Sequence, residues 1–211
     1  MKKNLNLLIF VLVSCWALPV QALMLSIDPL FQEVPKGGTV DAALSISGLG
    51  DGVAPSLSAF DLDVDYDDLI LYFDSISFGD PDRGDQVDFS NSLNFADTEP
   101  FNDQGIFWDY DASTNDVVNF YEISIDEPNI LINNQAPSFT LATLTFTALA
   151  LGTSPLDISV IALGDARGDP LTFDAVNNAS VDVIPEPATV TLLGGGLAGI
   201  ALWRKKKVPP S

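Results

Sequence analysis

The side chains of this 211-residue chain that could do chemistry are mostly carboxylates, because the sequence has no histidine and one cysteine, Cys15. Ser-His-Asp and Cys-His catalysis and histidine-based zinc sites are therefore excluded. Carboxylate oxygens are ligands that calcium prefers. The segment GDPDRGD contains Asp80, Asp82 and Asp85, and a turn can bring such carboxylates together, so it is a candidate calcium site. An acidic turn without any metal is the common alternative.

The segment GIFWDYDAS is a second candidate site, because it places Trp108 and Tyr110 beside Asp109 and Asp111. Exposed aromatic rings can stack on sugar rings, and carboxylates accept hydrogen bonds from sugar hydroxyls. In a β-strand Trp108 and Tyr110 share one face. The segment therefore predicts carbohydrate binding, and burial of Trp108 in the core is the alternative.

The charge of the region between residues 23 and 184 limits its partners. In that region 28 acidic side chains stand against three basic ones, Lys36, Arg83 and Arg167, so its formal charge is −25. Such a surface repels nucleic acid and anionic lipid headgroups and attracts cations. We therefore expect no nucleic-acid partner.

Alternation of apolar and polar residues, which is typical of half-buried strands, recurs along residues 23–183. It is clearest in AFDLDVDYDD, where the apolar residues of Phe60–Tyr66 alternate with aspartates. Further runs begin at Thr39, Leu69, Val117, Ser138 and Pro155, and short ones at Leu25, Gly105 and Ser180. Segments rich in Gly, Pro, Asn and Asp separate them and predict turns. About nine strands with this spacing predict an all-β fold, an antiparallel β-sandwich of the jelly-roll kind.

Residues 1–22 have the layout of a secretory signal peptide, in which Lys2 and Lys3 precede an apolar run and small residues precede a cleavage point after Ala22. The apolar run is shorter than the roughly 20 residues that a membrane span needs. The residues before Cys15 also fit the pattern of a lipid-modified cysteine, so lipoprotein processing is the alternative. Either interpretation predicts export of a domain without disulfides.

Residues 184–211 differ in character from the acidic domain. Pro185, Glu186 and Pro187 precede the apolar segment 188–203, and a basic cluster follows, formed by Arg204, Lys205, Lys206 and Lys207. Sixteen helical residues span about 24 Å, somewhat less than a hydrocarbon core of about 30 Å. The basic cluster predicts a cytoplasmic end with the domain outside. The prolines keep the preceding backbone extended, which presents a peptide bond to a protease. A tail anchor that is never cut is the alternative.

This three-part C-terminus resembles the PEP-CTERM sorting signal of exported bacterial proteins. The resemblance covers about the last 27 residues, from the Pro-Glu-Pro triplet to Ser211. It implies processing by an exosortase, an integral-membrane transpeptidase-like protease of Gram-negative bacteria that make exopolysaccharide. An inner-membrane intermediate would precede the mature protein at the cell surface or outside the cell.

The domain resembles the first half of cohesin-like β-sandwiches in two segments, LSIDPLFQEVPKGGTVDAALSISGL and LSAFDLDVDYDDLILYFDSISFGD. The segment VIALGDARGDPLTF is similar to the late strand and turn of that family. The resemblance implies the cohesin-like fold. Cohesins bind dockerin modules, but no residue of this sequence identifies a dockerin-binding face, so only the fold is carried over.

These observations predict three parts: a signal peptide (1–22), a cohesin-like sandwich (23–183) and a PEP-CTERM sorting signal (184–211). We expect that the protein is not an enzyme, because no catalytic framework is visible among its many aspartates. We expect a structural or adhesive component of the cell surface or exopolysaccharide matrix, whose partners are exosortase, the membrane and either exopolysaccharide or another surface protein. A calcium-assisted carbohydrate-binding module is the alternative, and a glycan hydrolase is a weaker one.

Overall fold

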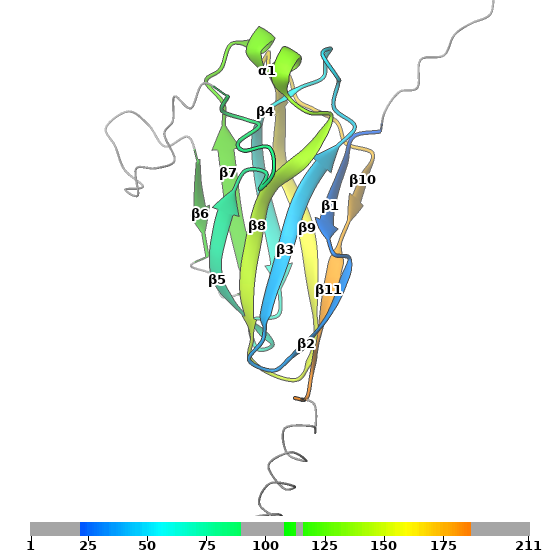
Figure 1. Cartoon of the computed structure of the whole chain (residues 1–211), viewed down its shortest axis with the longest axis vertical. Helices are drawn as coiled ribbons and strands as arrows, with labels where there is room; N and C mark the ends of the chain where they lie inside the picture. Colours follow the sequence, from blue (N-terminus) through cyan, green and yellow to red (C-terminus); the bar gives the residue numbers. More distant parts are fainter. Residues whose placement is uncertain (1–21, 90–107, 113–115, 187–211) are drawn as a thin grey trace, which may run out of the picture.

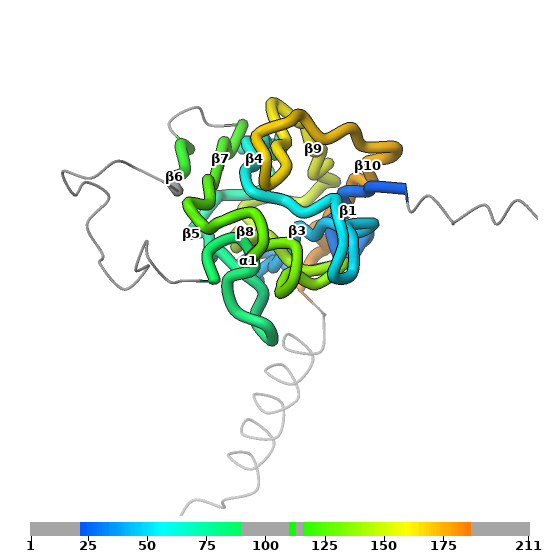
Figure 2. Tube along the Cα trace, turned by 90° about the horizontal axis from the view of Figure 1, so that it is seen from above, coloured from blue at the N-terminus to red at the C-terminus, as the bar shows by residue number. Residues whose placement is uncertain are grey.

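The computed structural model describes residues 22–89, 108–112 and 116–186. They form two β-sheets that lie face to face, seen from the side in Figure 1 and from above in Figure 2. One sheet has the spatial order β10 (Ala175–Asn177), β1 (Met24–Asp28), β3 (Thr39–Ser47), β8 (Ser138–Ala148) and β5 (Leu71–Phe78). The other has the order β2 (Phe31–Pro35), β11 (Ala179–Ile184), β9 (Gly152–Asp165), β4 (Leu57–Tyr66), β7 (Val117–Ile123) and β6 (Trp108–Asp111).

Both sheets are mixed, so the prediction of a purely antiparallel sandwich was wrong at two pairs. β1 pairs with β10 and β2 pairs with β11 in parallel, whereas the remaining neighbours are antiparallel. The first two strands, β1 and β2, thus run parallel to the last two, β10 and β11. In each of these two pairs of consecutive strands, one strand belongs to each sheet. Pro29 lies in the break between β1 and β2, where its missing N–H costs no ladder hydrogen bond.

The alternation in β4 determines which of its faces is buried. The side chains of Phe60, Leu62 and Val64 are at most 1% exposed, whereas the intervening aspartates lie on the outer face. There the amide of Asn119 on β7 donates to one carboxylate oxygen each of Asp61 and Asp63, at 2.8 Å in both cases. Asp61 and Asp63 thus pair with the neighbouring strand β7 on the outer face of the sheet.

Aromatic side chains from both sheets form the centre of the core. Phe60 and Phe120 of one sheet lie with ring centroids 6.0 Å apart, edge to face. The ring centroid of Phe146, on the facing sheet, lies 5.1 Å from that of Tyr66. Such pairs bury large apolar areas and favour a single packing arrangement. With no cysteine between residues 16 and 211, this core carries the stability of the fold.

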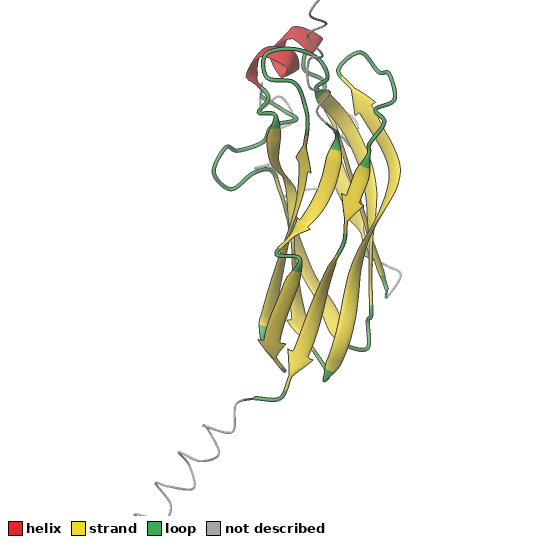
Figure 3. Ribbon diagram, turned by 90° about the vertical axis from the view of Figure 1, so that its right-hand side faces the viewer, coloured by secondary structure: helices red, strands yellow, loops and turns green. Residues whose placement is uncertain are grey.

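A short helix, α1 (Pro128–Asn134), closes one end of the sandwich, as Figure 3 shows. Pro128 stands in its first turn, where a missing N–H is harmless. Leu131 is its buried residue. The helix then ends at Gln135, whose backbone is extended. Seven residues are too few to show helical periodicity, and the sequence analysis did not predict this element.

The long strands were predicted well. The runs at Thr39 and Ser138 coincide with β3 and β8, and the runs at Leu69 and Val117 contain β5 and β7. The runs at Ala59 and Pro155 overlap β4 and β9, which begin two and three residues earlier. The described residues contain eleven strands where about nine were expected, because β2 and β10 are short edge strands. Their sequences lack a distinctive pattern, and pairing with neighbouring strands defines them.

Several predicted features lie outside the described residues: the signal peptide up to Gln21, Cys15, the apolar segment 188–203 and the basic cluster that follows it. These assignments stay predictions. Within the part of the chain that the structure describes, no helix has the length and apolar character that a membrane crossing requires.

The core arrangement predicts the effect of removing one central ring. Phe120 is fully buried and contacts Phe60 and Phe78, so Phe120→Ala should lower the free energy of unfolding by about 3–5 kcal/mol. Phe173→Ala removes the same atoms from a ring that is 41% exposed. This variant should change the free energy of unfolding by less than about 1 kcal/mol. Urea unfolding measures both. Equal losses in the two variants would contradict this description of the core.

Candidate functional site

A pocket of about 460 Å³ opens at the edge of the sandwich where β5 of one sheet lies near β6 of the other. Its volume lies within the range of small-molecule sites. Its aromatic and acidic lining residues are Tyr66, Asp68, Tyr72, Phe73, Asp74 and Tyr110. They come from three strands and one turn, so the pocket forms only when the two sheets pack together.

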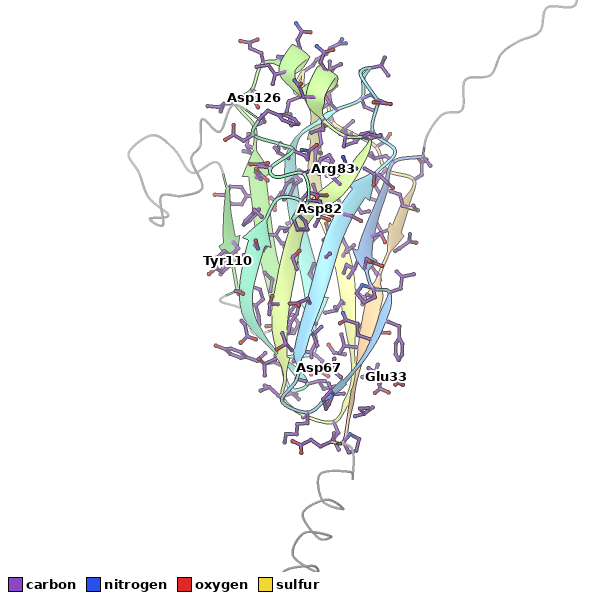
Figure 4. The ribbon with its side chains drawn as sticks, viewed as in Figure 1. Glu33, Asp67, Asp82, Arg83, Tyr110 and Asp126 are labelled. Atoms are coloured by element: carbon purple, nitrogen blue, oxygen red, sulfur yellow. The ribbon has the colours of Figure 1, made fainter. Side chains whose placement is uncertain are left out.

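Two aromatic contacts hold the walls of this pocket. The rings of Phe73 on β5 and Tyr110 on β6 meet edge to face at 5.8 Å, which joins the two sheets at their open edge. Phe73 also contacts Phe146 of the core at 5.7 Å. The pocket is therefore anchored to the core, while Tyr110 remains 44% exposed at its mouth, at the sheet edge marked in Figure 4.

The polar groups of the pocket are hydroxyls and carboxylates. Burial, with the carboxylates of Asp68 and Asp116 nearby, raises the pKa of Tyr66, so its hydroxyl stays protonated and can donate a hydrogen bond. Asp74 accepts a hydrogen bond of 2.6 Å from the hydroxyl of Thr147. Tyrosine rings beside carboxylates suit a ligand with an apolar face and several hydroxyls, which describes a sugar.

The predicted sugar-binding residues belong to β6, and one of them is placed in the pocket. Tyr110 lines the pocket, and Trp108 pairs with Glu122 through its backbone, while the side chain of Trp108 lies outside the described part of the structure. The sequence analysis missed Tyr66 and Tyr72 because their segments were interpreted only as apolar strands. No local pattern shows that these strands meet β6.

The predicted calcium ligands do not converge. Both oxygens of Asp80 accept backbone N–H bonds, Oδ1 from Asp82 and Arg83 and Oδ2 from Thr140 on β8. Partial burial works to raise the pKa of Asp80, but these donors outweigh it and the net shift is downward. Asp82 is exposed in this turn, as Figure 4 shows. Among the described residues no group of three metal-ligating side chains could hold an ion, so a calcium site stays a prediction.

Asp85, the third of these residues, instead pairs with a glutamate that the sequence analysis did not single out. Its carboxyl group forms a side-chain hydrogen bond with Glu122 of β7, which is 1% exposed. Asp85 Oδ2 and Glu122 Oε1 are both buried and have no hydrogen-bond donor when both groups are ionised. Two carboxylates in contact cannot both stay charged in a buried site, so the pair shares a proton.

Electrostatics favours placing that proton on Glu122. Burial, together with the carboxylates of Asp85 and Asp88, raises the pKa of Glu122 to about 9. Burial also raises the pKa of Asp85, although the backbone N–H groups of Val87 and Asp88 work against it. One signal in the sequence could have revealed Glu122. It follows Val118 and Phe120 at a spacing of two, on the face that β7 buries.

Two buried glutamines hold the loop that carries Asp85. The side chain of Gln135 accepts from the backbone N–H of Leu57 at 2.6 Å and donates to the carbonyl groups of Leu57 and Gln86. Gln86 in turn accepts from the N–H of Ala136 at 3.1 Å. These bonds tie the acidic loop to the end of α1 and the start of β4, and satisfy polar groups that would otherwise be buried without partners.

The sorting triplet lies directly behind the last strand. β11 ends at Ile184, and Pro185 and Glu186 are exposed, whereas Pro187 lies outside the described residues. The carbonyl of Ile184 accepts a 3.0 Å hydrogen bond from the N–H of Lys36. The domain thus holds the chain firmly up to Ile184, and the triplet begins where this hydrogen bonding stops.

Comparison with solved structures identifies the class of the fold. The sandwich is similar to a cohesin from Clostridium thermocellum, solved in a type I cohesin–dockerin complex, with 14% identity, a TM-score of 0.55 and coverage of 77% of this chain and 99% of that one. The seventh ScaB type I cohesin of Pseudobacteroides cellulosolvens gives 14% identity, a TM-score of 0.54 and coverage of 79% and 94%. A non-cellulosomal cohesin from the archaeon Archaeoglobus fulgidus is 13% identical, with a TM-score of 0.52 and coverage of 81% of this chain and 96% of that one.

These similarities confirm that the domain is a cohesin-like β-sandwich. Residues 183–207 match the PEP-CTERM protein-sorting motif, which confirms the resemblance of the C-terminus to that sorting signal. The motif indicates export and exosortase-dependent localisation at the surface of a Gram-negative bacterium. Among curated proteins, none matches the sequence significantly.

The shared proton of Asp85 and Glu122 predicts an unusual pH dependence of stability. Between the ordinary pKa of 4.5 and the raised value of about 9, the folded protein binds a proton at Glu122 that the unfolded chain has released. The free energy of unfolding should therefore fall as the pH rises through this range. Glu122→Gln keeps a neutral hydrogen-bonding group there, so its Tm should fall less and exceed that of the parent protein near pH 9.

Thermal unfolding at a series of pH values measures this difference. Glu33→Gln on β2 changes an exposed glutamate and should preserve the slope of the parent protein. Parallel curves for the parent and Glu122→Gln would contradict the shared proton. A rise in Tm on adding calcium that Glu122→Gln abolishes would also contradict it, because a cation would then neutralise the pair.

Proposed function

We propose that this protein is an exported binding protein that exosortase processes at Pro185-Glu186-Pro187 and that acts at the cell surface or in the exopolysaccharide matrix. The observation that carries the proposal is the position of the sorting motif. The matched residues 183–207 begin within β11, and Pro185 and Glu186 are exposed directly after it. A protease could therefore reach the triplet while the sandwich stays folded.

The C-terminal segment serves as a temporary membrane anchor in this proposal. The apolar segment 188–203 would hold the exported chain in the inner membrane, and Arg204 to Lys207 would stay on the cytoplasmic side. Cleavage near the triplet would separate the acidic sandwich from this segment. The mature protein would then be at the cell surface or outside the cell.

A structural or adhesive role for the sandwich is supported by its fold and charge. Cohesin-like folds and sorting signals are not catalytic frameworks, and the solved relative from Clostridium thermocellum forms a complex with a dockerin. For this chain we propose a protein or glycan partner at the surface. The strongly acidic domain makes nucleic acid an unsuitable partner.

Carbohydrate binding in the pocket between β5 and β6 is a second candidate function. The pocket combines Tyr72 and Tyr110, which are both partly exposed, with the carboxylates of Asp68 and Asp74. These groups can stack on a sugar ring and accept hydrogen bonds from its hydroxyls. A neutral or cationic exopolysaccharide fits this site, because an anionic one would meet repulsion from the two aspartates.

Processing predicts a defined mass for the mature protein. Intact mass spectrometry of protein from its native host should find a species that ends near Pro185–Pro187 in the surface or extracellular fraction. The double variant Pro185→Ala/Pro187→Ala should remain in the membrane fraction with Ser211 at its C-terminus. Pro170→Ala, in an exposed turn of the domain, should be processed normally. A full-length parent protein in the membrane fraction would overturn the proposal in favour of a permanent tail anchor.

Sugar binding predicts a loss of affinity when the pocket is altered. Tyr110→Ala removes the ring at the mouth of the pocket and should weaken binding to a responsive polysaccharide about tenfold, which corresponds to about 1.4 kcal/mol. Phe31→Ala is the matched control, since Phe31 is 55% exposed on β2 at the opposite edge of the same sheet. Isothermal calorimetry across a glycan panel measures both. Absence of binding to every glycan would reject this second function.

A further inference from the structure

The end of the sandwich from which the chain leaves is built by three turns and the end of β11. The N–H of Lys36, in the turn between β2 and β3, donates to the carbonyl of Ile184 at 3.0 Å. The N–H of Leu149, in the turn between β8 and β9, donates to the carbonyl of Ile70 at 2.7 Å. The turns and the C-terminal exit therefore form one connected surface, at the lower end of Figure 1.

This surface exposes leucines at the tips of its turns. The exposed fractions are 75% for Leu69, 43% for Leu149 and 56% for Leu151. Lys36 is exposed beside them. Among the described residues it is the one basic side chain of this end, because Arg83 and Arg167 lie in turns towards the other end of the strands. We name Lys36, Leu69, Leu149 and Leu151 the exit face.

The length of the connection limits how far the exit face can lie from a membrane. Three residues, Pro185 to Pro187, lie between Ile184, the last residue of β11, and Ala188, the first residue of the apolar segment. Fully extended, the four Cα–Cα steps from Ile184 to Ala188 span at most about 14 Å. The headgroup layer on each side of a bilayer is itself about 5–8 Å thick. A bilayer that contains the apolar segment therefore lies within reach of the exit face.

Resting on the proposed membrane-anchored intermediate, we propose that the exit face contacts the surface of the lipid bilayer while the apolar segment is inserted. Leucine side chains at turn tips gain by moving from water to the level of the headgroups and upper acyl chains. Lys36 can reach a lipid phosphate. The contact holds the sandwich upright and keeps Pro185 and Glu186 beside the membrane, where an integral-membrane protease acts.

Charge determines which lipids favour this contact. Glu186 and Asp67 lie near the exit face, although one oxygen of Asp67 already accepts the N–H of Leu69 at 3.0 Å. The acidic domain would be repelled by an anionic surface, so the contact depends on the leucines and on the covalent connection. Zwitterionic lipid is therefore the bilayer that fits best.

The test places an environment-sensitive NBD label at one position of residues 23–211, the chain expected after signal-peptide removal, which has no cysteine of its own and is reconstituted into phosphatidylcholine vesicles. The label stands at Leu151→Cys on the exit face or at Val53→Cys, which is 61% exposed in the loop between β3 and β4 at the opposite end. Emission at position 151 should shift to shorter wavelength and lose intensity with spin-labelled lipid. Emission at position 53 should stay as in water.

Flotation of the vesicles separates the possible failures. Protein that floats with the vesicles but shows water-like emission at both positions would overturn the contact while leaving the anchored intermediate intact. Protein that does not float would overturn the anchored intermediate and the contact with it. Leu69→Asp/Leu149→Asp, with the label at position 151, should still float but lose the shift, whereas Val53→Asp should keep it. An unchanged shift in the double variant would also overturn the contact.

Discussion

The register of β4 between β7 and β9 is the constraint on which the rest of the structure depends. In the observed register Phe60, Leu62 and Val64 enter the core while the alternating aspartates face water. A shift by one residue would exchange the two sets of side chains. It would bury several carboxylates at a cost of several kcal/mol each, which no protein of this size could sustain. A chain with so many aspartates therefore folds in one register.

Packing the two apolar sheet faces together leaves the two ends of the sandwich open. The two ends differ in the side chains that cover them. At the end with α1, Gln86 and Gln135 form hydrogen bonds with buried backbone groups, and Asp85 and Glu122 meet in a buried pair. At the opposite end the turns carry exposed leucines instead of a polar network. The first end is closed by hydrogen bonds, whereas the second faces the departing chain.

The pocket and the exit face are neighbours. Asp68 lines the pocket, and Leu69, the next residue, belongs to the exit face. The turn between β4 and β5 therefore contributes to both surfaces. A membrane at the exit face would leave the side of the sandwich accessible, so β5 and β6 could meet a ligand before or after the C-terminal segment is removed.

The sequence by itself determined the all-β class, the long strands and the sorting signal, because period-two alternation and the Pro-Glu-Pro motif are local features. It also identified Tyr110, but only the packing of β5 against β6 placed that ring opposite Phe73 in a pocket. The parallel edge pairs, the divergence of Asp80, Asp82 and Asp85, and the meeting of Asp85 with Glu122 were decided by tertiary structure. The physical reason is distance along the chain. Packing of the loop after β5 against β7 brings Asp85 and Glu122, which are 37 positions apart, into contact, and only there do burial and neighbouring charge determine what a carboxylate does.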